Sequence, residues 1–86
     1  MSDTIEPVVI EKVRHVGKAV DGDTELTPDT PLLERQLLDS VELLQLVMEL
    51  ESAFGISIPL EELVEENFAD VNRVVALVER ARERAA

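Results

Sequence analysis

The stretch that decides the fold is LLDSVELLQL, residues 37–46. Asp39 and Glu42 in it have the spacing of a capping box, in which the residue before a helix and the third helical residue satisfy free N–H groups at the helix start. The pattern therefore predicts a helix that begins at Ser40. Because Asp39 already fits the cap, the Ser40 hydroxyl is expected to point to solvent. The positive end of the helix dipole beside it favours an attached phosphate.

The predicted helix continues to about Phe54, and Gly55 is expected to end it. Apolar residues recur in it at helical spacing, which predicts one buried face. The stripe comprises Leu43, Val47, Leu50 and Phe54, with Leu46 beside it.

Upstream, apolar residues separated by four, four, three and four positions predict one face of an N-terminal helix. These residues are Ile5, Val9, Val13, Val16 and Val20. Pro7 fits near the first turn, where a missing N–H group costs little. Residues 21–36 show no clear period and predict a long connection, with Leu26, Leu32, Leu33 and Leu37 as candidate anchors.

Downstream, residues 60–66 predict a short acidic helix with Leu63 facing inward. A last helix is predicted from about Val71 to Arg84. Its apolar face comprises Val71, Val74, Val75 and Val78. We therefore expect one all-α domain over residues 1–86, a bundle of three main helices and one short helix with a long loop between the first two.

Composition excludes several function classes. The net charge of −11 disfavours nucleic acid and anionic membranes as partners. There is no cysteine, so any thiol must come from outside the chain. We find no secretion signal and no apolar run of membrane-spanning length, and we expect a cytoplasmic protein.

The acidic residues are unevenly distributed. Between Arg35 and Arg73 there is no basic residue but there are nine acids. A surface of one sign favours fast, weak docking to basic partners, although most charge runs are simply solvated. The nine are Asp39, Glu42, Glu49, Glu51, Glu61, Glu62, Glu65, Glu66 and Asp70.

Other sites are disfavoured by their residues. DGDTEL at 21–26 alternates acids as a calcium loop does, but Leu26 stands where such a loop needs glycine. His15 has no second histidine near it and is interpreted as a surface or packing residue. A hydrolase that uses Ser40 as its nucleophile lacks a base and a strand-turn-helix elbow. We predict no catalytic residue and no metal site.

The longer stretch LLDSVELLQLVMELESAFGISIP, residues 37–59, resembles the signature of acyl carrier proteins and their aminoacyl-carrying relatives. Asp39-Ser40 leads an amphipathic acidic helix, an aromatic residue ends it, and Ile58-Pro59 follows at the family's spacing. The order of predicted helices also matches. The resemblance implies an acyl-carrier-like bundle.

It also implies a non-catalytic carrier. Ser40 would receive 4′-phosphopantetheine from coenzyme A, and the thiol of this arm would hold an acyl or aminoacyl group as a thioester. Asp39 would help to position the modifying phosphopantetheinyl transferase. Loading enzymes and downstream synthases or transferases would be the other partners of a monomeric carrier. Implied contacts with partners are the apolar Val41 and Met48 and the acidic Glu42, Glu49, Glu62 and Glu66.

The cargo is left open. Leu37 and Leu38 stand before Asp39, where peptidyl carrier domains typically have glycines. The sequence is closer to D-alanyl carriers and to free-standing carriers of polyketide or nonribosomal peptide pathways than to the usual fatty-acid carriers. The alternative is a small acidic helical adaptor that binds a basic protein without a covalent cofactor.

Overall fold

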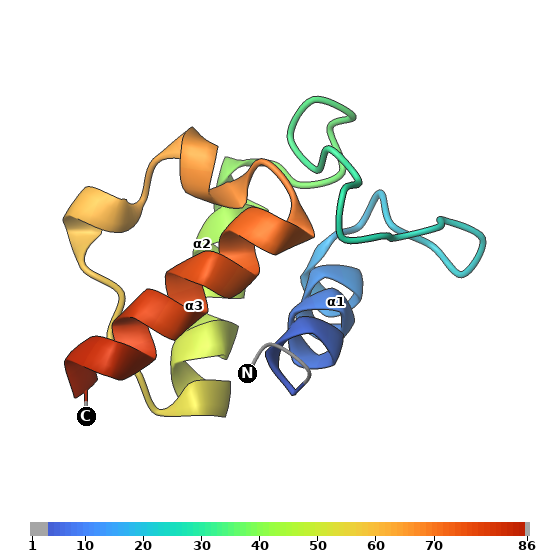
Figure 1. Ribbon diagram of the computed structural model, residues 1–86. Coiled ribbons are helices and arrows are strands. Elements are labelled where there is room, and N and C mark those ends of the chain that lie inside the picture. The colour runs from blue at the N-terminus through green and yellow to red at the C-terminus, as the bar shows by residue number, and fades with distance from the viewer. Residues whose placement is uncertain (1–3, 86) are drawn as a thin grey trace.

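The computed structural model describes residues 4–85 of the chain, without the side chain of Ala85, and contains only helices and connecting segments within that range (Figure 1). The all-α prediction is confirmed. The elements are three α-helices, α1 (Ile5–Val16), α2 (Ser40–Phe54) and α3 (Val71–Ala85), and two short 3₁₀ helices, η1 (Leu60–Glu62) and η2 (Glu65–Phe68).

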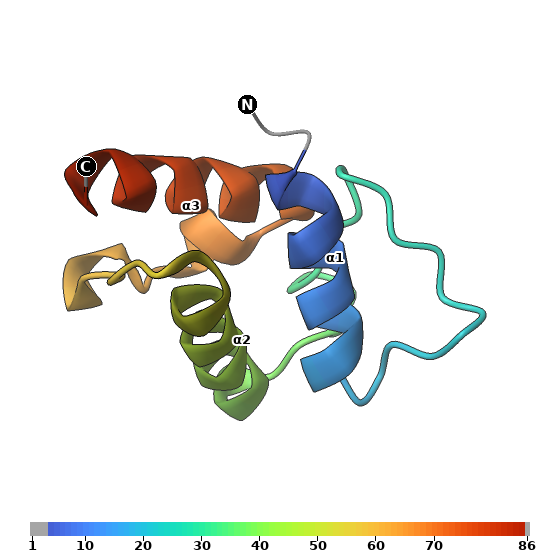
Figure 2. The ribbon, with the colours of Figure 1, turned by 90° about the horizontal axis from the view of Figure 1, so that it is seen from below.

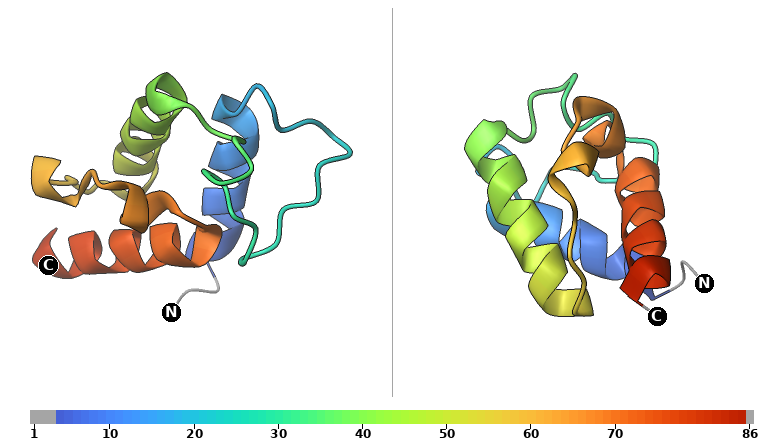
Figure 3. Two further views of the ribbon diagram at one scale, coloured as in Figure 1. Left: turned by 90° about the horizontal axis from the view of Figure 1, so that it is seen from above. Right: turned by 90° about the vertical axis from the view of Figure 1, so that its left-hand side faces the viewer.

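The three α-helices enclose one core. α1 and α2 lie next to each other, and α3 crosses both of them (Figures 2 and 3). The long loop extends beyond α1, and the η1–η2 segment lies on the opposite side of the molecule, between α2 and α3 (Figure 3). In this arrangement the start of α2 lies at the surface of the molecule.

The first helix ends earlier than its apolar spacing predicts. α1 stops at Val16, and Val20 is buried from within the loop. A β-carbon added to Gly17 would lie 3.0 Å from the Leu37 carbonyl oxygen and 3.0 Å from Val20 Cγ2. A side chain at position 17 would therefore be crowded. Gly17 itself is extended, with φ of −83° and ψ of 106°, so the helix ends there and the Val20 N–H group donates to the Gly17 carbonyl in a turn.

The long loop is attached to α3. Leu32 is fully buried, and its N–H group donates to the Ala69 carbonyl at 2.8 Å. The Asn72 N–H group donates to the Pro28 carbonyl. Leu37 is buried as predicted, whereas Leu26 and Leu33 are only partly buried against the core.

The second helix has the predicted bounds. Gly55 ends it with φ of 63°, in the left-handed region where glycine has no steric penalty. The most deeply buried residues of α2 are Leu46 and Leu50, whereas Leu43 and Phe54, expected in the buried stripe, are partly buried. The core face is thus rotated toward Leu46.

The segment between α2 and α3 differs from the expected single short helix over residues 60–66. η1 and η2 are separated by Leu63 and by an extended Val64. η2 then places Phe68 in the core, where it is 1% exposed. Leu63 is partly buried. The predicted apolar face of α3 is confirmed, and Leu77 and Ala81 complete it.

Candidate functional site

Ser40 is the first residue of α2, and its side chain is exposed. Both halves of the predicted capping box are present. The Glu42 N–H group donates to Asp39 Oδ1 at 2.8 Å, and the Asp39 N–H group donates to Glu42 Oε1 at 3.0 Å. Neighbouring side chains therefore make the cap, and the Ser40 hydroxyl is left accessible at the positive end of the helix.

Ser40 also lies at the rim of a groove between α2 and the η1–η2 segment. The groove has a volume of about 320 Å³. Its lining is largely apolar and comprises Ser40, Leu43, Leu44, Val47, Leu63, Val64, Glu65 and Phe68. A larger hollow of about 710 Å³ lies beside the long loop, but its lining does not include Ser40.

Exposed apolar side chains lie on α2 and on the η1–η2 segment. Val41 is 64% exposed and Met48 is 66% exposed, so neither is a core residue. Leu44 is also exposed, and its spacing of three and four from these residues forms a second stripe on α2 that sequence reasoning missed. Leu60 and Val64 extend the exposed apolar set onto the η1–η2 segment, and no periodic signal in the sequence marks them.

The structure contradicts the expectation that Glu42 lies on an acidic docking surface. Glu42 is only 6% exposed. Besides its bond in the capping box, its Oε2 accepts a hydrogen bond from the Lys18 N–H group at 2.9 Å. Both carboxylate oxygens are used within the molecule, so Glu42 cannot present its charge to a partner.

Glu49, another expected docking residue, faces α1. Its carboxylate lies 3.4 Å from Lys12 Nζ and 3.2 Å from His15 Nε2. His15 is a surface residue, as predicted. The contacts join α1 to α2 and compensate part of the charge of Glu49.

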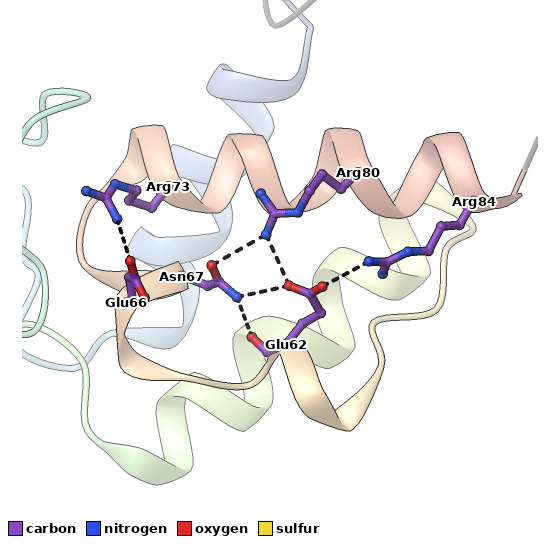
Figure 4. A network of polar contacts seen from close by, with 6 residues as sticks. All are labelled: Glu62, Glu66, Asn67, Arg73, Arg80 and Arg84. Carbon is purple, nitrogen blue, oxygen red and sulfur yellow. Dashed lines mark hydrogen bonds and ion pairs between the residues drawn. The ribbon is translucent and has the colours of Figure 1, made fainter.

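Glu62 is held by two arginines of α3 (Figure 4). Its carboxylate accepts a hydrogen bond from Arg84 at 2.9 Å and one from Arg80 at 3.1 Å. Asn67 donates to the Glu62 carbonyl and carboxylate. The hydrogen bonds from Arg84 and then Arg80 lower the pKa of Glu62 below its ordinary value of 4.5.

Glu66 is the most accessible of the four expected acidic docking residues. Its side chain is 80% exposed, and its contact with Arg73 is long, at 3.8 Å (Figure 4). Glu61 and Glu65 are also exposed. Three exposed acids thus lie on the η1–η2 segment, and one of them, Glu65, lines the groove together with Ser40.

The residues present fit a phosphodiester on Ser40. The hydroxyl is exposed, the N-terminal end of α2 favours negative charge, and the cap of the helix does not depend on the hydroxyl. The apolar groove begins at the same residue. An arm attached there could extend into solvent or lie along the groove without displacing any core side chain.

Comparisons with known proteins agree with this geometry. The family profile described as phosphopantetheine attachment site matches residues 9–78. The D-alanyl carrier protein of Lactococcus lactis subsp. lactis (strain IL1403) is 32% identical over 75 residues, 85% of this chain and 95% of the relative. The acyl carrier protein of Rubrobacter xylanophilus (strain DSM 9941) is 48% identical over 57 residues, 63% of this chain and 69% of the relative.

A third relative is the probable acyl carrier protein PigG of Serratia sp. (strain ATCC 39006), which is 35% identical over 72 residues, 81% of this chain and 83% of the relative. In the part of the chain that the structure describes, no helix has the length and apolar content needed to cross a membrane. The chain belongs to the phosphopantetheine attachment family of acyl and aminoacyl carrier proteins, which are non-catalytic and hold their cargo on covalently attached 4′-phosphopantetheine.

Proposed function

We propose that Ser40 is the residue that carries 4′-phosphopantetheine. The observation that supports this proposal most directly is the exposed Ser40 hydroxyl at the first position of α2, beside a capping box made by Asp39 and Glu42. When bound, the group supplies a thiol that holds an acyl or aminoacyl cargo as a thioester.

The chain's own residues would present and orient this arm. Free N–H groups in the first turn of α2 would favour the negative phosphodiester beside Ser40. Asp39 has the extended backbone of an N-cap residue, and Ser40, which follows it, is exposed to solvent. We propose that the Asp39 side chain also helps to position the phosphopantetheinyl transferase on this turn.

The partner surface combines apolar and acidic residues. We propose that Val41 and Met48 contact partner enzymes, with Leu44 between them on the same face of α2. Glu66, with Glu61 and Glu65, would meet basic residues of these enzymes. Charged residues at a rim speed association, and apolar contacts supply binding energy, which suits repeated short encounters.

Two expected docking residues receive a changed role in this proposal. Glu49 and Glu62 are partly exposed but already paired, with α1 and α3 respectively. They would mainly hold the elements that display the partner surface. Glu42 is excluded from the surface because it is buried.

For the pathway we propose a class of reactions rather than a single cargo. Similarity to D-alanyl carrier proteins and to a probable acyl carrier protein supports a D-alanyl-type or specialised-metabolite role, such as polyketide or nonribosomal peptide synthesis. The partners would then be a loading enzyme and a downstream synthase or transferase. A single domain over residues 1–86, a monomeric state and a cytoplasmic location stay predictions.

Intact mass spectrometry tests the proposed site. The protein is incubated with coenzyme A, Mg²⁺ and a broad-specificity phosphopantetheinyl transferase. We expect the wild-type chain to gain the mass of one phosphopantetheinyl group and Ser40→Ala to gain none. Because Ser40 is exposed and outside the cap, Ser40→Ala should keep the wild-type circular dichroism spectrum and melting temperature.

The control is Ser57→Ala, which removes an exposed hydroxyl beyond the end of α2. This variant should be modified like the wild type. Modification of Ser40→Ala, or failure of the folded wild type with two different transferases, would contradict the assignment. The latter result would favour the adaptor alternative, which the family match disfavours.

A further inference from the structure

Glu42 is unusual among the acidic residues of this chain because its side chain is buried. Among the residues whose side chains the structure describes, it is the one buried acid. Burial of a carboxylate is strongly unfavourable unless hydrogen bonds compensate for the lost water. Each oxygen of the Glu42 carboxylate accepts a hydrogen bond from a backbone N–H group, and these bonds compensate for the lost water.

The contact joins two distant parts of the chain. Oε1 accepts the Asp39 N–H group at 3.0 Å, directly before Ser40. Oε2 accepts the Lys18 N–H group at 2.9 Å, across 24 positions of sequence. One carboxylate therefore connects the residue that precedes Ser40 to the turn that follows α1.

The turn on the far side of this contact is itself closely packed. A β-carbon on Gly17, the neighbour of Lys18, would lie 3.0 Å from the Leu37 carbonyl oxygen. Leu37 and Leu38, which lead into Asp39, are both buried. The backbone before Ser40 is thus held by apolar burial, and Glu42 adds a hydrogen-bonded attachment at its last residue.

We infer that Glu42 is a positioning residue for the modification of Ser40, an inference that rests on the proposed function. In that reaction Ser40 Oγ forms a bond to the β-phosphorus of coenzyme A, and the pyrophosphate P–O bond breaks. Adenosine 3′,5′-bisphosphate leaves, and the hydroxyl proton passes to a base of the transferase or to water. Glu42 touches none of the reacting atoms and acts by holding the Asp39–Ser40 backbone in one geometry.

A capping role alone does not need the second oxygen. A capping box requires one acceptor at the third helical residue, and Oε1 supplies it. The bond from Lys18 to Oε2 instead ties the start of α2 to the turn after α1. Small displacements of a reacting group reduce rates strongly, so a looser Ser40 turn should lower the rate of transfer.

The test compares Glu42→Gln with Glu11→Gln. The first variant keeps the size of the side chain but replaces one acceptor oxygen by an NH₂ group, which cannot accept from an N–H group. The second makes the same charge change at an exposed position of α1. Steady-state transfer of phosphopantetheine gives kcat and KM, and amide hydrogen exchange reports on Lys18 and Asp39.

For Glu42→Gln we expect kcat to fall about tenfold, with KM within about twofold of the wild type, because the reacting hydroxyl is displaced while the docking surface is retained. Exchange at Lys18 should be faster. Glu11→Gln should match the wild type in both measurements. Val75→Ala, a core truncation on α3, should lower the melting temperature without lowering kcat when the protein is folded.

An unchanged kcat in folded Glu42→Gln would overturn the inference and leave Glu42 a purely stabilising residue, while the Ser40 assignment would still hold. Equal loss of kcat in Val75→Ala would overturn it as well. If Glu42→Gln does not fold, Glu42→Asp, which keeps the charge on a shorter side chain, is measured instead and should also show a lower kcat. Failure of the wild type to be modified would instead overturn the proposed function and this inference together.

Discussion

The two walls of the groove beside Ser40 are built in different ways. The wall formed by α2 is a long helix with a capping box and fully buried residues at Leu46 and Leu50. The wall formed by η1 and η2 consists of two short 3₁₀ turns with one fully buried anchor, Phe68. Because 3₁₀ turns have poorer hydrogen-bond geometry, the second wall is locally the less stable of the two.

The polar contacts of the two walls also differ, because those at the start of α2 are buried and those of η1 are partly exposed. At the start of α2, Glu42 is buried and makes short hydrogen bonds to backbone N–H groups. At η1, Glu62 is paired with arginines whose side chains are about half exposed. Exposed ion pairs are screened by salt, whereas buried hydrogen bonds are screened much less. We therefore expect the wall that presents Ser40 to open less readily than the opposite wall.

Removal of the one fully buried side chain of the second wall is expected to have the largest effect. Phe68→Ala should lower the free energy of unfolding by about 3 to 5 kcal/mol, because a fully buried ring is replaced by a cavity. Urea denaturation followed by circular dichroism measures this loss.

The matched variant on the first wall is Leu46→Ala, with an expected loss of about 2 to 5 kcal/mol. In native-state hydrogen exchange, Phe68→Ala should expose the amides of residues 60–68 before those of α2. Uniform loss of protection along the whole chain in Phe68→Ala would show that the two walls unfold as one unit. That result would contradict the lower local stability expected for the second wall.

A smaller effect is expected from removal of the cap of α2. Asp39→Ala should lower the free energy of unfolding by about 1 kcal/mol, because the Glu42 N–H group loses its acceptor at 2.8 Å. Thermal unfolding measures the change. Asp39→Asn keeps a good capping oxygen and should retain most of the stability.

The same pair of variants separates capping from recognition by the transferase. If Asp39 contributes its charge to that encounter, Asp39→Asn should raise KM for modification while its melting temperature stays near the wild type. Equal KM values for Asp39→Asn and the wild type would restrict Asp39 to its structural role.

The smallest effect is expected at Glu62, and it should depend on salt and pH. Since Arg84 and Arg80 lower the pKa of Glu62 in the folded chain, its contribution is fully present above the ordinary value of 4.5. The contribution is lost as the pH falls through the lowered pKa, because the folded carboxylate then also takes up a proton. Hydrogen exchange at residues 60–67 should therefore accelerate as the pH falls below 4.5, after correction for the intrinsic rate.

Glu62→Gln removes the charge and should show this faster exchange already at neutral pH, with little further dependence on salt. Arg73→Gln is the control, because its contact with Glu66 is long and exposed. Identical exchange in Glu62→Gln and the wild type at low salt would mean that the ion pairs do not hold the second wall.

The parts of the molecule that local patterns predicted are those held by neighbours in sequence. The bounds of α2, both halves of its capping box and the left-handed Gly55 all depend on residues within one turn of each other. The apolar face of α3 follows from helical spacing alone. The accessible Ser40 hydroxyl follows in turn from the position of Asp39.

Other features required contacts between distant segments. Apolar spacing placed Val20 on the first helix, but that helix ends at Val16, Gly17 is extended, and Val20 is buried from within the loop. A run of acids indicated one docking surface, but its members differ in exposure. Glu42 is buried where its carboxylate accepts from the Lys18 backbone N–H group, and Glu62 is paired because α3 brings Arg80 and Arg84 beside it.

The amino-acid order alone thus specified the bounds of α2, the apolar face of α3, the family and the serine that we propose as the attachment residue, because hydrogen bonds and side-chain periodicity within a helix are local. Tertiary packing alone decided which carboxylates remain accessible and how the wall opposite Ser40 is held. The physical reason is that a charge is neutralised or buried by whatever the fold places next to it, and such neighbours lie far away in sequence, as Lys18 does from Glu42 and Lys12 from Glu49.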